Sequence, residues 1–389
     1  MLAARECFSL YIHIPYCISK CPYCDFNSHV VARIPEQAYT ESLIQELDHY
    51  AVLDDWRSRT VQSIFFGGGT PSTFDPASIT KILERAARQW AVPSDCEITL
   101  EANPGTVDEA HFAGYRACGV NRISVGVQSF QPRLLKFLGR AHSAEEARKA
   151  LGVVREAGFD NFSLDLIYAN PTQTLTELAN DLEAALGFQP PHLSAYNLTI
   201  EEGTPFHQEF RKGKIQLLTE EQEIAMADLI EQRLRDAGLA RYEISNYARS
   251  GLHSRHNTNY WRGGDYLGLG AGAHSYKKLP DESMPGQRWS NEKIPARYIA
   301  RINQNGAAVV DHETIDVNKA AGEFMFLGLR MTEGVSTQNF RDKFGKQPVE
   351  FYPQIDIWKE GRLMEEKSGF IRLTNKGFLV ANSIFVEFM

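Results

Sequence analysis

Three of the six cysteines lie close together near the start of the chain, in a pattern that can bind metal. Cys17, Cys21 and Cys24 are spaced by four and three residues, which places three thiolates on one short loop. Three thiolates can bind three irons of a cubane 4Fe–4S cluster and leave the fourth iron without a protein ligand. The alternative is a zinc site, which needs a fourth side chain such as His13 or His29. The spacing therefore predicts a metal centre, and the fourth ligand decides which kind.

A glycine-rich segment is the second feature with chemical potential. The run Gly67-Gly68-Gly69-Thr70 follows a short apolar segment that reads as a strand. Glycine has no Cβ, so a ligand can approach the backbone N–H groups closely. A plain tight turn is the simpler interpretation of such a triplet. Its place at the carboxyl end of a strand, where α/β barrels bind ligands, favours a binding loop.

Polar side chains also occur within or at the ends of three later strand patterns. These are Glu101, Gln128 and Asp165, on successive units of the chain. Polar groups that reach a common point from strand ends are typical of a barrel-type site. A carboxylate such as Glu101 can accept hydrogen bonds from ribose hydroxyls. A buried salt bridge, with Arg122 as its partner, explains the same carboxylate equally well.

These residues need a scaffold that brings strand ends together, and the first half of the chain alternates strands with helices. Helical patterns separate strand patterns at 10–14, 61–66, 96–102, 122–128, 162–168 and 192–199. Such alternation implies parallel strands that are joined by right-handed crossovers. Six units are too few for a closed barrel of eight, so we predict an open, partial (β/α)6 barrel with a lateral mouth.

The pattern changes after the barrel, and we expect three regions in all. The partial barrel covers 1–240, a connecting segment covers 241–310, and a C-terminal domain covers 311–389. The connecting segment is rich in Gly, Asn, Tyr and His and has no clear period. The last region reads as helices around a strand at 369–373, which predicts a mostly helical, winged-helix-like domain.

Net charge, apolar runs and the distribution of cysteines exclude several classes of binding partner and cellular location. The chain has 389 residues and a formal net charge of −8, which argues against nucleic acid as a partner and against an RNA-modifying enzyme. No stretch approaches the roughly 20 apolar residues that a membrane span needs. The cysteines are too unevenly spread for a secreted disulfide framework. We therefore expect a cytoplasmic protein, with any membrane association only peripheral, through a membrane-bound partner.

The Cys-x3-Cys-x2-Cys spacing after the first strand of an α/β barrel resembles the radical S-adenosylmethionine superfamily. The longer stretch from Leu10-Tyr-Ile-His-Ile-Pro15 to Asp25-Phe-Asn-Ser-His29 resembles the oxygen-independent coproporphyrinogen III oxidase family. This resemblance implies a 4Fe–4S cluster whose open iron binds S-adenosylmethionine, reductive cleavage of that nucleotide, and an electron donor such as flavodoxin or ferredoxin. By the same resemblance, the positions that contact S-adenosylmethionine are Tyr11, Tyr23, Gly68, Gly69, Thr70, Glu101, Gln128, Arg140 and Asp165.

Two features distinguish the branches of that family. The oxidase branch has a further cysteine two residues after the third, where this chain has Phe26. The run His256-Asn-Thr-Asn-Tyr260-Trp261 is similar to a pattern that marks the heme chaperone branch. Imidazole can be an axial ligand of heme iron, and aromatic rings can stack on a porphyrin. The simpler interpretation is that His256 only forms hydrogen bonds within a loop.

The resemblance therefore predicts a heme chaperone, which binds heme or a related tetrapyrrole and passes it to an acceptor protein. Heme is expected at His256, Tyr260 and Trp261, and His274, in a small-residue loop, is the second candidate for the iron ligand. The alternative is a radical S-adenosylmethionine oxidase of porphyrin biosynthesis on the same scaffold. The further rival iron ligands are His13, His29 and His142.

Overall fold

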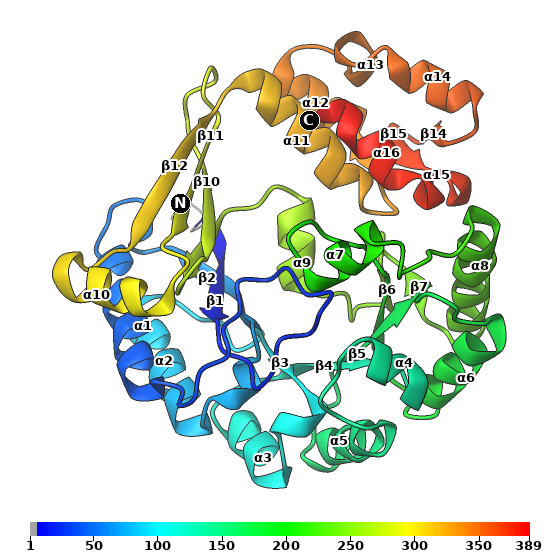
Figure 1. Ribbon diagram of the computed structural model, residues 1–389. Helices are drawn as coiled ribbons and strands as arrows, with labels where there is room; N and C mark the ends of the chain where they lie inside the picture. Colours follow the sequence, from blue (N-terminus) through cyan, green and yellow to red (C-terminus); the bar gives the residue numbers. More distant parts are fainter. Residues whose placement is uncertain (1–5) are drawn as a thin grey trace.

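One large sheet forms the body of the molecule, of which the computed structural model describes residues 6–389. Six consecutive strands pair in parallel and in chain order. They are β1 (Cys7–Ile14), β2 (Thr60–Gly68), β3 (Glu97–Ala102), β4 (Arg122–Gln128), β5 (Phe162–Tyr168) and β6 (His192–Asn197). The curved sheet and its outer layer of helices confirm the prediction of a partial α/β barrel (Figure 1).

Amphipathic helices cover the outside of this sheet. They are α1 (Glu36–Ala51), α2 (Pro76–Gln89), α3 (Glu109–Ala117), α4 (Pro132–Phe137), α5 (Ala144–Glu156) and α6 (Leu175–Leu186). In α2 the Asp75 carboxylate caps the helix by accepting a hydrogen bond from the Ala77 N–H at 2.7 Å. Its apolar face packs into the core through Ile79, Ile82, Leu83 and Ala86. Burial of that face, at helical spacing, holds the layer to the sheet.

The sheet continues beyond the barrel on both sides. Past β6 lie β8 (Asn246–Ala248) and β7 (Ala240–Arg241); past β1 lie β9 (Tyr266–Leu269), β10 (His274–Lys278), β11 (Gly286–Asn291) and β12 (Val309–Ile315). Strand β9 pairs in parallel with β1, and β10 to β12 continue as antiparallel strands. The sequence did not predict these strands, because the segment that contains them has no clear hydrophobic period. Much of the segment expected to connect two domains is therefore part of the main sheet, and the domain limits at 240 and 310 stay predictions.

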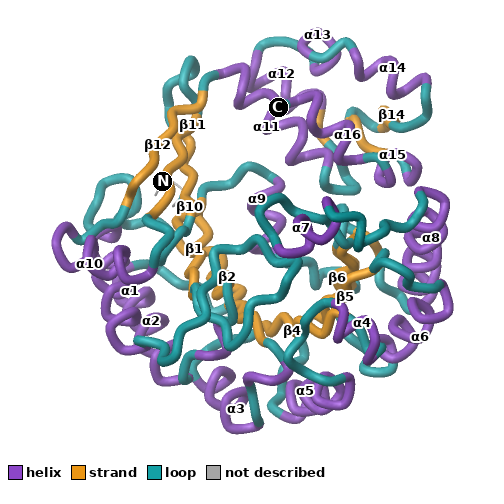
Figure 2. The backbone as a smooth tube through the Cα atoms, in the orientation of Figure 1, coloured by secondary structure: helices purple, strands orange, loops and turns teal. Residues whose placement is uncertain are grey.

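The C-terminal region packs around an apolar core of its own, which includes Met325, Phe340 and Ile371. Figure 2 shows it as a mainly helical group above the main sheet. Three short antiparallel strands form its wing, in the order β13-β15-β14, in agreement with the predicted winged-helix-like shape. Its elements are α11 (Val317–Leu329), β13 (Val335–Ser336), α12 (Thr337–Phe344), α13 (Pro348–Phe351), α14 (Gln354–Glu360), β14 (Met364–Lys367), β15 (Phe370–Leu373), α15 (Asn375–Leu379) and α16 (Ala381–Phe385).

Three further helices lie between the barrel and this region: α7 (Pro205–Arg211), α8 (Glu220–Asp236) and α9 (Arg255–Trp261). Helix α8 is capped by the Thr219 side chain and buries Met226, Ile230 and Leu234 at helical spacing. Helix α9 carries the His-Asn-x-x-Tyr-Trp run and packs against β2. Within residues 6–389, none of the helices combines the length and the apolar character that crossing a bilayer requires.

A buried carboxyl group holds the sheet extension against the barrel. Glu46 of α1 accepts hydrogen bonds from the Gly270 N–H at 2.8 Å, the Asn291 side-chain amide at 2.7 Å and the Tyr298 hydroxyl at 2.7 Å. Gly270 follows β9, Asn291 ends β11, and Tyr298 lies in α10 (Pro295–Asn305). Burial raises the pKa of Glu46 to about 7, and the three donors oppose that rise. One side chain therefore joins three segments of the extension to the first helix.

We predict that Glu46→Ala destabilises the protein by about 3 kcal/mol, because it leaves three buried donors without an acceptor. Urea and thermal unfolding measure the loss, and Glu41→Ala, at an exposed position of the same helix, is the matched control. The folded state binds the Glu46 proton more tightly than the unfolded chain, whose pKa is near 4.5. The contribution of Glu46 is therefore greatest at low pH and declines as pH rises through 7. An equal loss at about pH 5 and about pH 8 would contradict this account.

Candidate cluster and cofactor site

The loop after β1 closes on itself and presents the three cysteines. The Cys17 N–H donates to the His29 carbonyl at 3.0 Å, and the His29 N–H donates to the Pro15 carbonyl at 2.7 Å. Within the loop, the Cys24 N–H donates to the Cys21 carbonyl at 3.1 Å. All three thiols are free and partly buried. The backbone of the loop therefore fixes where the thiols stand before any ligand binds.

Donors from outside the loop reach two of the sulfurs. The Thr70 hydroxyl donates to Cys17 Sγ at 3.4 Å, and Arg140 Nη1 donates to Cys21 Sγ at 3.6 Å. Burial raises the pKa of the Cys17 and Cys24 thiols, and hydrogen bonds to Cys17 from Thr70 and a neighbouring serine act in the opposite direction. Such donors stabilise a thiolate, which is the form that binds metal.

The arrangement of thiols is compatible with a cubane cluster. Among residues 6–389, no three His, Cys, Asp or Glu side chains converge as ligands of one metal ion would. In a cubane cluster each thiolate binds a different iron, so the sulfurs do not have to converge on one point. The predicted cluster ligands Cys17, Cys21 and Cys24 are thus compatible with a 4Fe–4S cluster as placed.

A cavity of about 660 Å³ opens beside the cysteine loop, within the size range of sites for small molecules and cofactors. The carboxyl ends of β2 to β6 form its floor, as the strand-end pattern predicts. Glu101 accepts a hydrogen bond from the Gly68 N–H at 3.2 Å, and Ser124 donates to the Asp165 carboxylate at 3.1 Å. Burial, with the Asp165 charge, raises the pKa of Glu101 to about 8. The shift favours the protonated form of this carboxyl group, which can donate a hydrogen bond as well as accept one.

Among the lining residues that the structure describes, Gln128 and Arg140 each carry a buried polar atom without a hydrogen-bond partner. Gln128 adopts a positive φ of 68°, and its Oε1 accepts no hydrogen bond. Arg140 donates through Nη2 to Asn103 Oδ1 at 2.5 Å and to the Gly126 carbonyl at 2.9 Å, whereas its Nε is unpaired. Strained backbone and unpaired buried atoms in a cavity wall are features of binding sites. The donor set therefore fits a polar nucleotide such as S-adenosylmethionine.

The cavity gathers most of the residues predicted to contact S-adenosylmethionine. Those that line it, together with the three cysteines, are Tyr23, Gly68, Gly69, Thr70, Glu101, Gln128, Arg140 and Asp165. Tyr11 does not line it, because its ring lies beside Phe65 and its hydroxyl bonds His13 Nδ1 at 3.0 Å. Sequence reasoning missed several polar lining residues. Asn103 and Asn197 stand at strand ends, where the same rule points to them, and Ser124 lies within β4.

His256, the first predicted heme ligand, lies in the wall of the barrel. It is 1% exposed, and its ring stacks on Phe65 with the ring centroids 5.0 Å apart. Burial lowers the pKa of His256 to about 3. Its Nδ1 hydrogen-bonds with the Ser63 hydroxyl at 3.0 Å and its Nε2 with the Tyr260 hydroxyl at 2.9 Å. An iron would have to displace one of these partners. Heme ligation by His256 stays a prediction.

The other predicted heme residues fall into two groups. Tyr260, Trp261 and His274 line a second cavity, which lies between the sheet extension and the C-terminal region. The remaining histidines already have ring partners: His13 bonds Tyr11 and the Asn27 carbonyl, His29 bonds Asn27 Oδ1, and His142 bonds the Val127 carbonyl.

Comparison with known proteins agrees with this geometry. Residues 11–185 match the family model described as Radical SAM superfamily, and residues 315–380 match the HemN C-terminal domain. The protein named heme chaperone HemW of Haemophilus influenzae is 39% identical over 98% of this chain and 97% of that protein. This chain belongs to the HemW family. The HemW of Escherichia coli is 36% identical and covers 98% of each chain. The superfamily predicted from the cysteine spacing, and the heme chaperone branch predicted from the flanking stretch and the His-Asn-x-x-Tyr-Trp run, are thereby confirmed.

A solved structure gives the same result for the fold of this HemW family member. Coproporphyrinogen III oxidase (HemN) from Escherichia coli, described as a radical SAM enzyme, superposes with a TM-score of 0.82. The match covers 99% of this chain and 90% of that one, at 23% identity. At that identity the likeness shows a shared fold, which confirms the predicted fold class.

We predict that Gly69→Ala impairs cluster assembly. A Cβ at Gly69 would lie 2.7 Å from the Tyr16 carbonyl oxygen and 2.8 Å from the Tyr16 nitrogen, so the backbone that leads into the cysteine loop must move. Iron and sulfide per chain after anaerobic reconstitution should fall well below the wild-type value. Gly152→Ala is the control, because no atom lies within 4 Å of its added Cβ. Equal iron in both variants would show that the close approach of these two loops is not required.

Proposed function

We propose that this protein is a heme chaperone that uses a 4Fe–4S cluster and S-adenosylmethionine. The observation that carries the proposal is the loop of three free, backbone-fixed thiols at a nucleotide-sized cavity. It occurs in a chain whose full-length relatives at 36–39% identity are named heme chaperone HemW. The names of the relatives support heme as the ligand that is carried, and the thiols and the cavity support the cluster and S-adenosylmethionine as cofactors.

In this proposal Cys17, Cys21 and Cys24 hold the cluster, and the strand ends hold the nucleotide. The chemistry that such a pair supplies when bound is one-electron reduction of a sulfonium. The backbone at 68–70 lets the amino-acid end approach closely, since a glycine there leaves the N–H groups open. Glu101, with its raised pKa, and the neighbouring Asp165 offer hydrogen bonds for ribose hydroxyls.

The oxidase alternative has less support. Phe26, at the position of the oxidase branch's further cysteine, is 61% exposed at the rim of the cavity. A phenyl ring there can neither bind iron nor exchange a proton with a substrate. The likeness to coproporphyrinogen III oxidase is one of fold, whereas the relatives at higher identity carry the chaperone name. The electron donor, the heme acceptor and the cytosolic location stay predictions.

We predict that anaerobically reconstituted protein binds heme at about one molecule per chain and passes it on. Titration followed by the Soret band measures uptake, and transfer is measured by separating the protein from apomyoglobin as a probe acceptor. With coproporphyrinogen III, S-adenosylmethionine and reductant, no protoporphyrinogen should form.

Cys17→Ser separates the role of the cluster from that of heme, and Cys118→Ser is the control at a free cysteine outside the loop. We expect Cys17→Ser to lose iron and sulfide, whereas Cys118→Ser keeps both. Wild-type protein with an intact cluster that takes up no heme, or that converts coproporphyrinogen, would overturn the chaperone proposal.

A further inference from the structure

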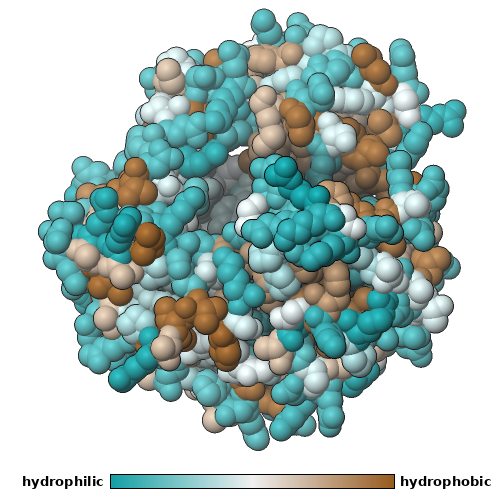
Figure 3. Space-filling view, viewed as in Figure 1, coloured by the Kyte–Doolittle hydropathy of each residue, from teal (hydrophilic) through white to brown (hydrophobic). Residues whose placement is uncertain are grey.

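The second cavity is the larger of the two, at about 1090 Å³. Its walls come from β9, β10 and β11 on one side and from α11 and α12 on the other, and the end of α9 closes it. Figure 3 shows the molecule hollowed between the C-terminal region and the main sheet, where this cavity lies. The volume is at the upper end of the range for small-molecule sites, which suits a large ligand.

Aromatic side chains form much of the wall. Tyr260 packs edge-on against Tyr266 with ring centroids 4.6 Å apart, and Tyr266 stacks on Tyr276 at 6.1 Å. Trp261 lies beside them, and its Nε1 is buried without a hydrogen-bond partner in the part of the chain described. Phe324 of α11 lines the cavity from the C-terminal region. Flat apolar surfaces of this kind bind a flat, aromatic ligand.

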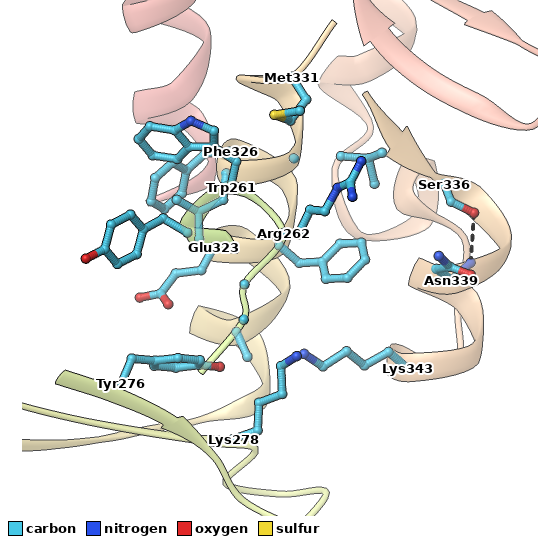
Figure 4. Close-up of a pocket in the computed structure, with 18 of the residues that line it drawn as sticks. Trp261, Arg262, Tyr276, Lys278, Glu323, Phe326, Met331, Ser336, Asn339 and Lys343 are labelled. Atoms are coloured by element: carbon cyan, nitrogen blue, oxygen red, sulfur yellow. Dashed lines mark hydrogen bonds between the residues drawn. The ribbon is translucent and has the colours of Figure 1, made fainter. Parts of the chain in front are cut away.

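Two lysines from opposite walls face one another across the cavity. Figure 4 shows the side chains of Lys278, from β10, and Lys343, from α12, with their ends directed together. Within residues 6–389, neither ammonium forms an ion pair with a carboxylate. The two arginines of this cavity are already paired, Arg262 with Glu333 at 3.2 Å and Arg288 with Glu323 at 2.5 Å.

This lysine pair has no directly paired counter-charge among residues 6–389. Burial and the nearby Lys278 charge lower the pKa of Lys343, and Glu323, which is already paired with Arg288, acts in the opposite direction. An anion between the two ammonium groups would offset their mutual repulsion. Lys343 also lies over the Phe324 ring, at 5.6 Å from its centroid. A ligand that places carboxylates next to a flat ring would therefore meet cations and an aromatic surface together.

An imidazole stands at the other end of the same strand. His274 is exposed, lines the cavity, and its ring forms no hydrogen bond with any residue in 6–389. Partial burial of the ring, with the Lys293 and Arg288 charges, lowers its pKa, and Asp311 acts in the opposite direction. The shift favours the neutral ring, whose unprotonated nitrogen can bind a metal. His274, Tyr276 and Lys278 share one face of β10, because alternate residues of a strand point the same way. The strand spans roughly 13 Å from the imidazole to the ammonium residue.

We propose that this second cavity is the heme site, with His274 as iron ligand and Lys278 and Lys343 as partners of the propionates. Tyr276 and Phe324 flank the macrocycle. His256 is a positioning residue, which anchors α9 to β2 through Ser63 and orients the Tyr260 hydroxyl within α9. Heme has iron at its centre and carboxylates along one edge, which matches the order of imidazole, ring and ammonium along β10. The inference rests on the proposed chaperone function and names the site where its cargo binds.

Two porphyrins and matched variants test the site. Heme and iron-free protoporphyrin IX share their ring and carboxylates, and only heme needs an iron ligand. With reconstituted protein, His274→Ala should weaken heme binding about tenfold, shift the Soret band and leave protoporphyrin binding unchanged. The unchanged protoporphyrin titration also shows that this variant is folded.

Lysine variants probe the carboxylate end. Lys278→Ala combined with Lys343→Ala should weaken both porphyrins about tenfold or more, because each loses its charged partners. Lys277→Ala, on the opposite face of the same strand and paired with Asp55 at 2.6 Å, is the control and should change neither titration. Full binding of both porphyrins by the double variant would overturn the assignment of the propionate partners.

The outcomes separate this inference from the proposed function. If wild-type protein takes up no heme, both fail. If it takes up heme and His274→Ala keeps the same affinity and the same Soret band, the function stands and the iron-ligand assignment is overturned. His256→Gln keeps a hydrogen-bonding side chain in the wall and should keep the heme spectrum. A lost axial-ligand signature in that folded variant would instead assign the iron to His256.

Discussion

Strand β1 is the constraint on which both cavities depend, because it hydrogen-bonds in parallel to a neighbour on each side. It pairs with β2 from Cys7 to Ile14 and with β9 from Ser9 to Ile12. Its carboxyl end leads into the cysteine loop, and β9 begins the wall of the second cavity. The Asn27 amide reinforces this link by donating to the carbonyls of 271 and 293, each at 2.9 Å. The two sites are therefore held by one strand and one loop.

The barrel could be predicted from sequence because each of its parallel strands pairs with the next strand in the chain. Local periodicity then gives both the elements and their order. The extension could not be predicted in this way, since β9 pairs with a strand more than 250 residues earlier and is only four residues long. Its register depends on tertiary contacts such as the Glu46 network, for which Glu46 itself, within an ordinary amphipathic helix, gives no local signal.

The same distinction applies to site residues. A polar residue within or at the end of a strand pattern was enough to place Glu101, Gln128 and Asp165 in one cavity, because the strands are parallel and neighbours in chain order. Tyr11 also lies on a barrel strand, β1, but it does not line this cavity, and its hydroxyl hydrogen-bonds with His13. His256 is buried and its ring bonds Ser63 and Tyr260, whereas His274 is exposed and its ring has no hydrogen-bond partner among residues 6–389. Sequence alone cannot separate a buried, paired imidazole from an open one.

The two hydrogen bonds of His256 change what its six-residue motif signifies. One ring nitrogen bonds Ser63 of β2 and the other bonds Tyr260, which lines the second cavity. The imidazole thus links the barrel wall to that cavity although it does not itself line it. A change of side chain at 256 would therefore act on the second cavity indirectly, through the position of the Tyr260 ring.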